Sequence, residues 1–174
     1  MRTMTAAMVL AGLSACAAVI PIPLKAATAS SPAMPMAELR DASGAVKGSA
    51  MVHPMGDALH VEVKVSGMAP GTYAAHIHTV GQCEGPKFTT AGGHWNPEGK
   101  QHGKDNPAGA HKGDLPNITV GADGTGSTMA HIMASAASLM DADGAAVVIH
   151  AGPDDYKTDP TGNSGDRIAC GVLK

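Results

Sequence analysis

The sequence has very few aromatic residues: Phe, Trp and Tyr make up only 2% of its 174 residues. A buried core must therefore be built from Val, Ile, Leu, Met and Ala. The chain is punctuated by 22 glycines and 12 prolines, a composition that favours short strands over long helices. A chain of this length is expected to form one domain.

Charged residues are also scarce, at 16% of the chain, and the formal net charge is -3. The sequence contains no basic tract that would attract nucleic acid and no acidic tail that would act as a disordered arm. We therefore expect no nucleic-acid partner.

A long apolar run occurs only near the N-terminus, at residues 5–24. Small residues follow it, and the whole is typical of an export signal at 1–29. A membrane anchor is the weaker interpretation, because Pro21 and Pro23 break the run. The main alternative is a bacterial lipoprotein signal that ends before Cys16, whose lipidation would tether the protein to a membrane. In either case the mature chain leaves the cytoplasm.

The remaining chain divides into a short linker at 30–36 and a folded domain at 37–174. Only three cysteines are present, and one of them lies in the signal. Cys83 and Cys170 can pair in an oxidising compartment.

Hydrophobic residues alternate with polar ones most clearly in 58–67, which predicts a half-buried strand. Similar patterns with turn signals between them predict seven further strands, near 36–42, 45–53, 71–78, 115–120, 125–133, 145–150 and 167–173. Eight short strands without a convincing helix favour an antiparallel sandwich or barrel.

Two connections are too long to be hairpins, at about 79–114 and 151–166. Loops of this length without secondary structure are usually functional or disordered. The candidate ligands lie in these loops or at the strand ends beside them, so the loops are the expected functional segments.

Histidines form a pattern around these loops. His76 and His78 stand two residues apart on a predicted strand, so both imidazoles leave the same face, and His150 ends another strand. Each alone is more typical of a surface or structural histidine. Together with the loop residues they give seven potential metal ligands, namely His76, His78, His94, His102, His111, Asp114 and His150. This number exceeds one tetrahedral site and indicates two ions, with or without a shared ligand.

At these residues the sequence resembles the copper,zinc superoxide dismutases, especially the exported bacterial type, over about 37–173. The motifs are HIH at 76–78, AGGHWNP around 94, HG at 102, HKGDLPNI at 111–118, VVIHAGPDDY from 147 and TGNSGDRIACGV from 161. The resemblance implies an all-β fold, an eight-stranded antiparallel Greek-key sandwich or barrel of immunoglobulin-like type, with two long functional loops. It also implies a periplasmic location and leaves monomer and homodimer both open.

The resemblance further implies roles for individual residues. The copper ligands would be His76, His78, His94 and His150, and the zinc ligands would be His94, His102, His111 and Asp114. His94 would bridge the two ions. Arg167 would hold the superoxide anion, Asp154 would accept hydrogen bonds from His76 and His102, and Cys83 and Cys170 would form a disulfide.

The implied function is dismutation of superoxide to oxygen and hydrogen peroxide. The alternative is a non-catalytic exported module that binds copper and zinc. The presence of both His150 and Arg167 favours the enzyme, because relatives without activity tend to lose a copper ligand or the arginine. His53, His60 and His131 lie outside the motifs and are expected to be exposed or structural. The methionines are expected to fill the core or to be exposed by chance.

Overall fold

The computed structural model describes residues 34–174. It contains nine strands and two short helical turns: β1 Met36–Arg40, β2 Val46–Met55, β3 Ala58–Val65, β4 Gly71–Tyr73, β5 Ala75–His78, η1 Thr89–Ala91, β6 Ile118–Val120, β7 Gly126–Ile132, α1 Ala136–Leu139, β8 Ala146–His150 and β9 Arg167–Val172. The predicted export signal and Cys16 lie outside the described residues. None of the helices in 34–174 has both the length and the apolar character needed to cross a membrane.

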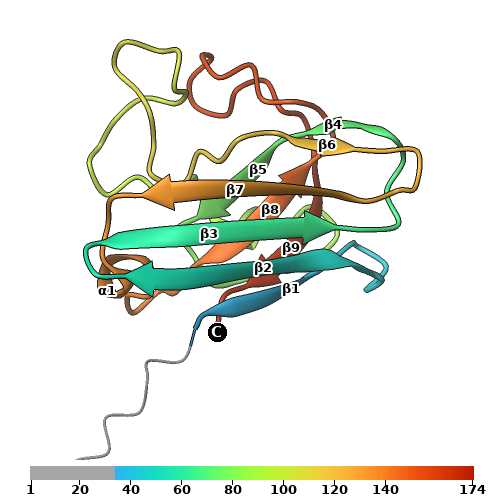
Figure 1. The fold of residues 1–174 in the computed structure, drawn as a ribbon, viewed down its shortest axis with the longest axis horizontal. Helices are drawn as coiled ribbons and strands as arrows, with labels where there is room; N and C mark the ends of the chain where they lie inside the picture. Colours follow the sequence, from blue (N-terminus) through green and yellow to red (C-terminus); the bar gives the residue numbers. More distant parts are fainter. Residues whose placement is uncertain (1–33) are drawn as a thin grey trace, which may run out of the picture. The chain divides into compact units, whose positions relative to one another are not determined.

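Seven strands form one curled sheet in the order β5-β8-β9-β1-β2-β3-β7, and β4 pairs with β6 in a second sheet. All of these pairs are antiparallel. Figure 1 shows β2, β3 and β7 in front of β5, β8 and β9. The predicted all-β, antiparallel fold is therefore confirmed.

The predicted strand at 71–78 is instead two strands. β4 pairs with β6, whereas β5 pairs with β8, so the chain passes from one sheet to the other between them. Ala74 lies at this transition, where its N–H donates to Gly152 O at 2.8 Å and its carbonyl accepts from His150 N at 2.9 Å. The count of eight strands was too low because alternation does not reveal which partner a strand has.

The predicted absence of helix is also slightly wrong, since Ser135 caps the single turn α1 through a hydrogen bond from Ser138 N.

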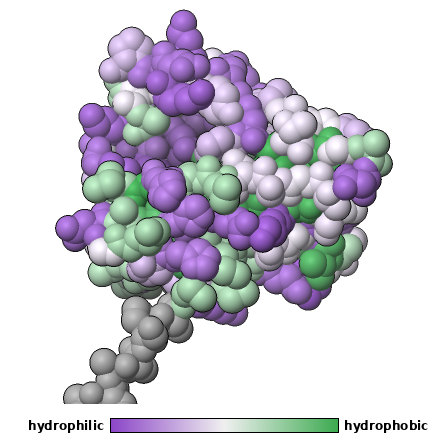
Figure 2. All heavy atoms as spheres, in the orientation of Figure 1, coloured by the Kyte–Doolittle hydropathy of each residue, from purple (hydrophilic) through white to green (hydrophobic). Residues whose placement is uncertain are grey.

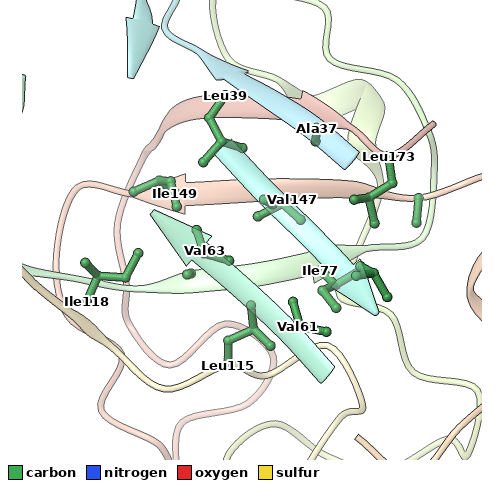
Figure 3. Close-up of a cluster of buried hydrophobic side chains, with 14 of the residues drawn as sticks. Ala37, Leu39, Val61, Val63, Ile77, Leu115, Ile118, Val147, Ile149 and Leu173 are labelled. Carbon is green, nitrogen blue, oxygen red and sulfur yellow. The ribbon is translucent and has the colours of Figure 1, made fainter. Parts of the chain in front are cut away.

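The core lies between the front and back strands of the curled sheet. In β3 the side chains of Leu59, Val61, Val63 and Val65 are buried, while their neighbours in sequence are at least partly exposed. Figure 3 shows Val61 and Val63 facing Ile77, Val147 and Ile149 across this core. Burial of these branched apolar side chains stabilises the barrel by about 25 cal/mol per Å² of apolar surface.

Strand β8 is buried on both faces. Its residues Val147 and Ile149 belong to the main core, whereas Ala146 and Val148 pack with Phe88 and Cys170 in a second cluster. The first part of the long loop therefore covers the outer face of β8. This packing holds the loop against the strand that ends in His150.

Candidate metal centre

Two buried strands and the long loop bring the first four histidines together. His76 and His78 lie on β5, and His150 ends the adjacent strand β8. His94 comes from the loop and forms an isolated β-bridge with His78. All four side chains are buried, and they offer ring nitrogens that lie within 4.8 Å of one another.

Each of these four histidines has one ring nitrogen that is buried and has no hydrogen-bond partner. The four atoms are His76 Nδ1, His78 Nε2, His94 Nε2 and His150 Nε2. A buried polar atom without a partner costs free energy, so four such atoms in one place need an explanation. A metal ion that accepts four lone pairs explains all of them.

The opposite ring nitrogens fix the orientation of the rings. His78 Nδ1 donates to Gly92 O at 3.0 Å, His150 Nδ1 donates to Gly165 O at 3.2 Å, and His76 Nε2 donates to Asp154 Oδ2 at 2.7 Å. Each ring therefore directs its lone pair inward, as metal-binding histidines commonly do.

Burial also keeps these imidazoles neutral. Desolvation, followed by repulsion from His94, lowers the pKa of His78 from 6.5 to about 2. Desolvation, followed by repulsion from His76, lowers the pKa of His150 from 6.5 to about 3. A neutral imidazole is the form that binds metal, so this cluster is ready for an ion at neutral pH.

A second cluster lies on the other side of His94. Asp114 Oδ1 is 3.0 Å from His94 Nδ1, 3.0 Å from His102 Nδ1 and 3.2 Å from His111 Nδ1. His94 Nδ1 is 3.3 Å from His102 Nδ1 and 3.4 Å from His111 Nδ1. Ligand atoms bound to one tetrahedral zinc at about 2.0–2.1 Å lie about 3.3 Å apart. The second cluster therefore has the dimensions of a tetrahedral zinc site.

His76 also lies within 4.8 Å of three donors of this second cluster. Its Nε2 is engaged by Asp154, however, and its free Nδ1 belongs to the first cluster. His111, at 3.2 Å from Asp114, is the better fourth donor because its nitrogen already lies at ligand spacing.

His94 stands between the clusters. Its Nε2 is one of the unpartnered atoms of the first cluster, and its Nδ1 faces the second. Desolvation lowers the pKa of His94 from 6.5 to about 4, although the hydrogen bond with Asp114 acts in the opposite direction. A single imidazole thus presents one nitrogen to each cluster.

Asp154 connects the clusters by a second route. Its Oδ2 accepts from His76 Nε2 at 2.7 Å, and its Oδ1 accepts from His102 Nε2 at 2.9 Å. Asn117 fixes the backbone of Asp154, because its Oδ1 accepts from Asp154 N and its Nδ2 donates to Asp154 O, both at 2.9 Å. Burial lowers the pKa of His102, but hydrogen bonds with Asp114 and Asp154 outweigh it and raise the pKa to about 9.

Arg167 begins β9 opposite His150 and is held close to the first cluster. Its Nη1 donates to Phe88 O and its Nη2 donates to Gly92 O, both at 2.7 Å. Because Gly92 O also accepts from His78 Nδ1, the guanidinium group is tied to the same backbone atom as a ring of the first cluster.

The disulfide between Cys83 and Cys170 is confirmed and closes a separation of 87 residues. It joins the long loop to β9, three residues after Arg167. The loop segment that supplies both carbonyl partners of Arg167 is therefore covalently linked to the strand that carries Arg167.

The structure brings all seven predicted ligands, Arg167 and Asp154 into one region. Sequence analysis missed Gly162, which has a positive φ of 64°. A Cβ there would lie 2.0 Å from Asp154 Oδ1 and 2.6 Å from His102 Nε2. It also missed Asn117. Both residues lie within the recognised motifs, but only the fold shows what they contact.

The chain matches the family described as copper/zinc superoxide dismutase (SODC) over residues 43–173. It is 42% identical over 147 residues to superoxide dismutase [Cu-Zn] 2 of Aquifex aeolicus, covering 79% of this chain and 85% of that protein. It is 44% identical over 131 residues to superoxide dismutase [Cu-Zn] of Caulobacter vibrioides, covering 70% and 73% of the two chains.

Solved structures show the same architecture. A SOD-like protein from Bacillus subtilis is similar, with a TM-score of 0.74 and 36% identity, over 80% of this chain and 97% of that chain. The Cu/Zn superoxide dismutase from Brucella abortus is similar, with a TM-score of 0.65 and 26% identity, over 82% of this chain and 100% of that chain.

Proposed function

We propose that this chain, which belongs to the copper/zinc superoxide dismutase family, converts superoxide to oxygen and hydrogen peroxide with one copper and one zinc ion. The observation that carries the proposal is the set of four buried, unpartnered imidazole nitrogens beside a second cluster at tetrahedral spacing. This donor set fits two ions of the kinds that the family uses.

We assign copper to the four unpartnered nitrogens of the first cluster, on His76, His78, His94 and His150, and call this set the copper cluster. We assign zinc to the second cluster, on His94, His102, His111 and Asp114, and call it the zinc cluster. Bound copper supplies one-electron redox chemistry, since imidazole ligands suit copper, whereas zinc has no redox chemistry and stabilises the loop.

The residues of the chain bind the substrate and handle the protons. Arg167 attracts the superoxide anion by charge and donates hydrogen bonds, because its guanidinium remains protonated. The carbonyls of Phe88 and Gly92 hold this group in one orientation, so little conformational entropy is lost when the anion binds. Arg167 also lines a surface hollow with Lys87 and Thr89.

His94 holds and releases a proton at Nε2, the atom that faces the copper cluster. Its Nδ1 remains directed at the zinc cluster and at Asp114, 3.0 Å away. The ring therefore keeps its orientation whether or not Nε2 carries the proton. The overall reaction consumes two superoxide anions and two protons for each oxygen and hydrogen peroxide formed.

A non-catalytic module that binds copper and zinc would not need Arg167 beside the copper cluster. The two hydrogen bonds that orient this arginine favour the enzyme over the module.

We further propose that the protein is exported to the periplasm, where its disulfide is stable. A lipid tether through Cys16 and a homodimer are additional proposals. Mass spectrometry of the native N-terminus tests the tether, and sedimentation of the mature protein tests the dimer.

The function is tested by following superoxide decay after pulse radiolysis, with the mature protein loaded with copper and zinc. Wild type is expected to accelerate decay catalytically, and Arg167→Ala is expected to slow it and to reduce its dependence on salt. Arg40→Ala is the matched control, because it removes the same charge from an exposed position. No acceleration by the fully loaded wild type would leave the metal-binding module as the better interpretation.

A further inference from the structure

Three histidines outside the metal centre line up across the front strands. In the strand registers His53 on β2 lies opposite His60 on β3, and His60 lies opposite His131 on β7. Their ring centroids are 6.0 Å and 4.6 Å apart, respectively. The residues on either side of His60, Leu59 and Val61, are buried in the core, so the histidines point away from it.

A parallel row of side chains lies next to the histidines on the same strands. Met51 on β2 lies opposite Glu62 on β3, and Glu62 lies opposite Met129 on β7. Residues two apart in a strand share a face, so both rows lie on the outer surface of the sheet. We name this surface the His–Met face, formed by His53, His60, His131, Met51, Glu62 and Met129. Figure 2 shows hydrophilic and moderately hydrophobic residues intermixed on the side where β2, β3 and β7 lie.

Two of these histidines already have the spacing of metal ligands. His60 Nδ1 is 3.2 Å from His131 Nε2, close to the roughly 3.3 Å between nitrogens bound to one tetrahedral ion. Among residues 34–174 neither ring has another hydrogen-bond partner that would compete with a metal. Glu62, the carboxylate of this face, forms an ion pair with Lys64 at 2.9 Å and not with either of these two histidines.

The exposed hydrophobic side chains are of an unusual kind. Five of the six large ones in the described chain are methionines, including Met129 at 60% exposure, and the sixth is Val46. Isolated exposed apolar residues need no explanation, but Met129 is a thioether two residues from His131 on the same face of β7. The sequence predicted that each methionine either fills the core or is exposed by chance. The structure places these five at the surface.

Imidazole and thioether donors together select copper. Copper exceeds the other divalent first-row metals in affinity for nitrogen sites, and thioethers favour Cu(I), whereas zinc gains little from methionine. We propose that the His–Met face binds one copper ion outside the metal centre. His60 Nδ1 and His131 Nε2 are the first two ligands, His53 is the third after a change of rotamer, and Met129 completes the shell for Cu(I).

The site is exposed and lies on strands that carry no residue of the metal centre. An ion bound there is therefore able to exchange with free ions in solution, unlike an ion in the buried copper cluster. The proposal depends on the donors of this face alone and does not require the dismutase activity.

The test uses the mature protein with its copper and zinc centre already filled, titrated with Cu(I) held by a coloured indicator under argon. Wild type is expected to withdraw one additional equivalent of Cu(I). The double variant His60→Gln/His131→Gln is expected to withdraw none, while Ser127→Gln, at an exposed position of β7 on the same face, withdraws as much as wild type. Unchanged melting temperature and dismutase rate in the double variant would show that its fold and metal centre are intact.

Wild type that takes up no additional copper, or a double variant that takes up as much as wild type, would overturn the proposal. A second comparison tests the thioether. Met129→Leu is expected to weaken binding of Cu(I) by about tenfold or more and binding of Cu(II) much less. Met34→Leu is the matched control, because Met34 is also exposed, at 47%, but precedes β1 and lies outside this face. Equal Cu(I) affinity in Met129→Leu and Met34→Leu would remove Met129 from the site.

Discussion

The copper cluster is carried mainly by strands, whereas the zinc cluster is carried by a long loop. His76, His78 and His150 lie on β5 and β8, whose backbones are paired with each other. His102, His111 and Asp114 lie on a segment without regular strands, between η1 and β6. Paired strands therefore position the imidazoles of the copper cluster, whereas a loop positions those of the zinc cluster.

The protonation of the two clusters differs accordingly. Deep burial lowers the pKa of His78 to about 2, whereas two carboxylates raise the pKa of His102 to about 9 despite burial. Without metal the copper cluster is a set of neutral imidazoles, whereas the zinc cluster contains a protonated imidazole, His102, paired with Asp114 at 3.0 Å. The comparison indicates that strands preorganise the copper cluster, while the zinc cluster releases the proton of His102 when an ion binds.

The largest expected effect comes from removing a strand-borne ligand. His78→Gln deletes one of the four unpartnered nitrogens, so copper affinity and superoxide turnover should fall to background. Zinc content should remain that of wild type, because His78 is absent from the second cluster. Superoxide decay and elemental analysis measure both quantities. Full activity with bound copper in this variant would contradict the assignment, and Ser127→Gln, at an exposed position of β7, serves as the surface control.

Removing the carboxylate at the centre of the loop cluster should have the next largest effect. Asp114 Oδ2 accepts from Gly103 N at 2.9 Å and His111 N at 3.0 Å, in addition to the contacts of Oδ1. Asp114→Asn should lower zinc affinity by more than about 100-fold, the upper end of losses seen when residues that support ligands are changed. It should also make the loop at 79–114 more sensitive to protease.

Chelator competition measures the zinc affinity of Asp114→Asn. Asp123→Asn is the control, since Asp123 is an exposed carboxylate in a turn that accepts from Thr125. Zinc affinity equal to that of the control would show that Asp114 is not a ligand.

A smaller effect is expected from a methyl group on Gly162. Its Cβ would meet Asp154 Oδ1 and His102 Nε2, so Gly162→Ala should displace their hydrogen bond and weaken zinc binding by about tenfold. Gly165→Ala is a matched control: Gly165 also has a positive φ, but its nearest neighbour would be 3.8 Å away. Both substitutions place a Cβ at a positive φ and therefore strain the backbone, but only the Cβ of Gly162→Ala would contact Asp154. Similar zinc affinities in the two variants would contradict this positioning role.

The most gradual effect is the pH dependence of the metal-free protein. The pKa values of His78, His94 and His150 are lowered from 6.5 to about 2, 4 and 3. Below pH 6.5 the unfolded state binds these protons more readily, so stability should fall as the pH decreases from 6.5 towards 4. His102, raised to about 9, has the opposite sign, and its contribution should be lost as the pH rises from 6.5 through 9.

Urea midpoints of the metal-free protein, measured from pH 4 to 10, test this expectation. The account predicts a maximum near neutral pH. A midpoint that does not change between pH 6.5 and 4 would show that these three imidazoles are not held neutral by burial.

The sequence was sufficient to predict most strands and to select the histidines that the fold brings together, and the reasons are local. His76 and His78 share a face through alternation alone, and β3 follows its hydrophobic pattern from Ala58 to Val65. The motifs supplied the long-range pairing of Cys83 with Cys170, which spacing by itself could not establish.

Other features depend on contacts that no local pattern encodes. The hydrogen bonds between Asn117 and Asp154 span 37 residues, and the contact of His60 with His131 spans 71. Alternation predicts that His60 points outward, but it does not identify the strand beside it. The division of 71–78 at Ala74 was missed for the same reason, because it follows from a change of partner strand.

The most direct test of the central claim is anomalous diffraction at the copper and zinc absorption edges from a crystal of the metal-loaded protein. The account predicts a copper peak bounded by His76 Nδ1 and by the Nε2 atoms of His78, His94 and His150. It predicts a separate zinc peak bounded by Asp114 Oδ1 and by the Nδ1 atoms of His94, His102 and His111. Copper absent from the four unpartnered nitrogens, or a zinc peak that does not contact His94, would contradict the account.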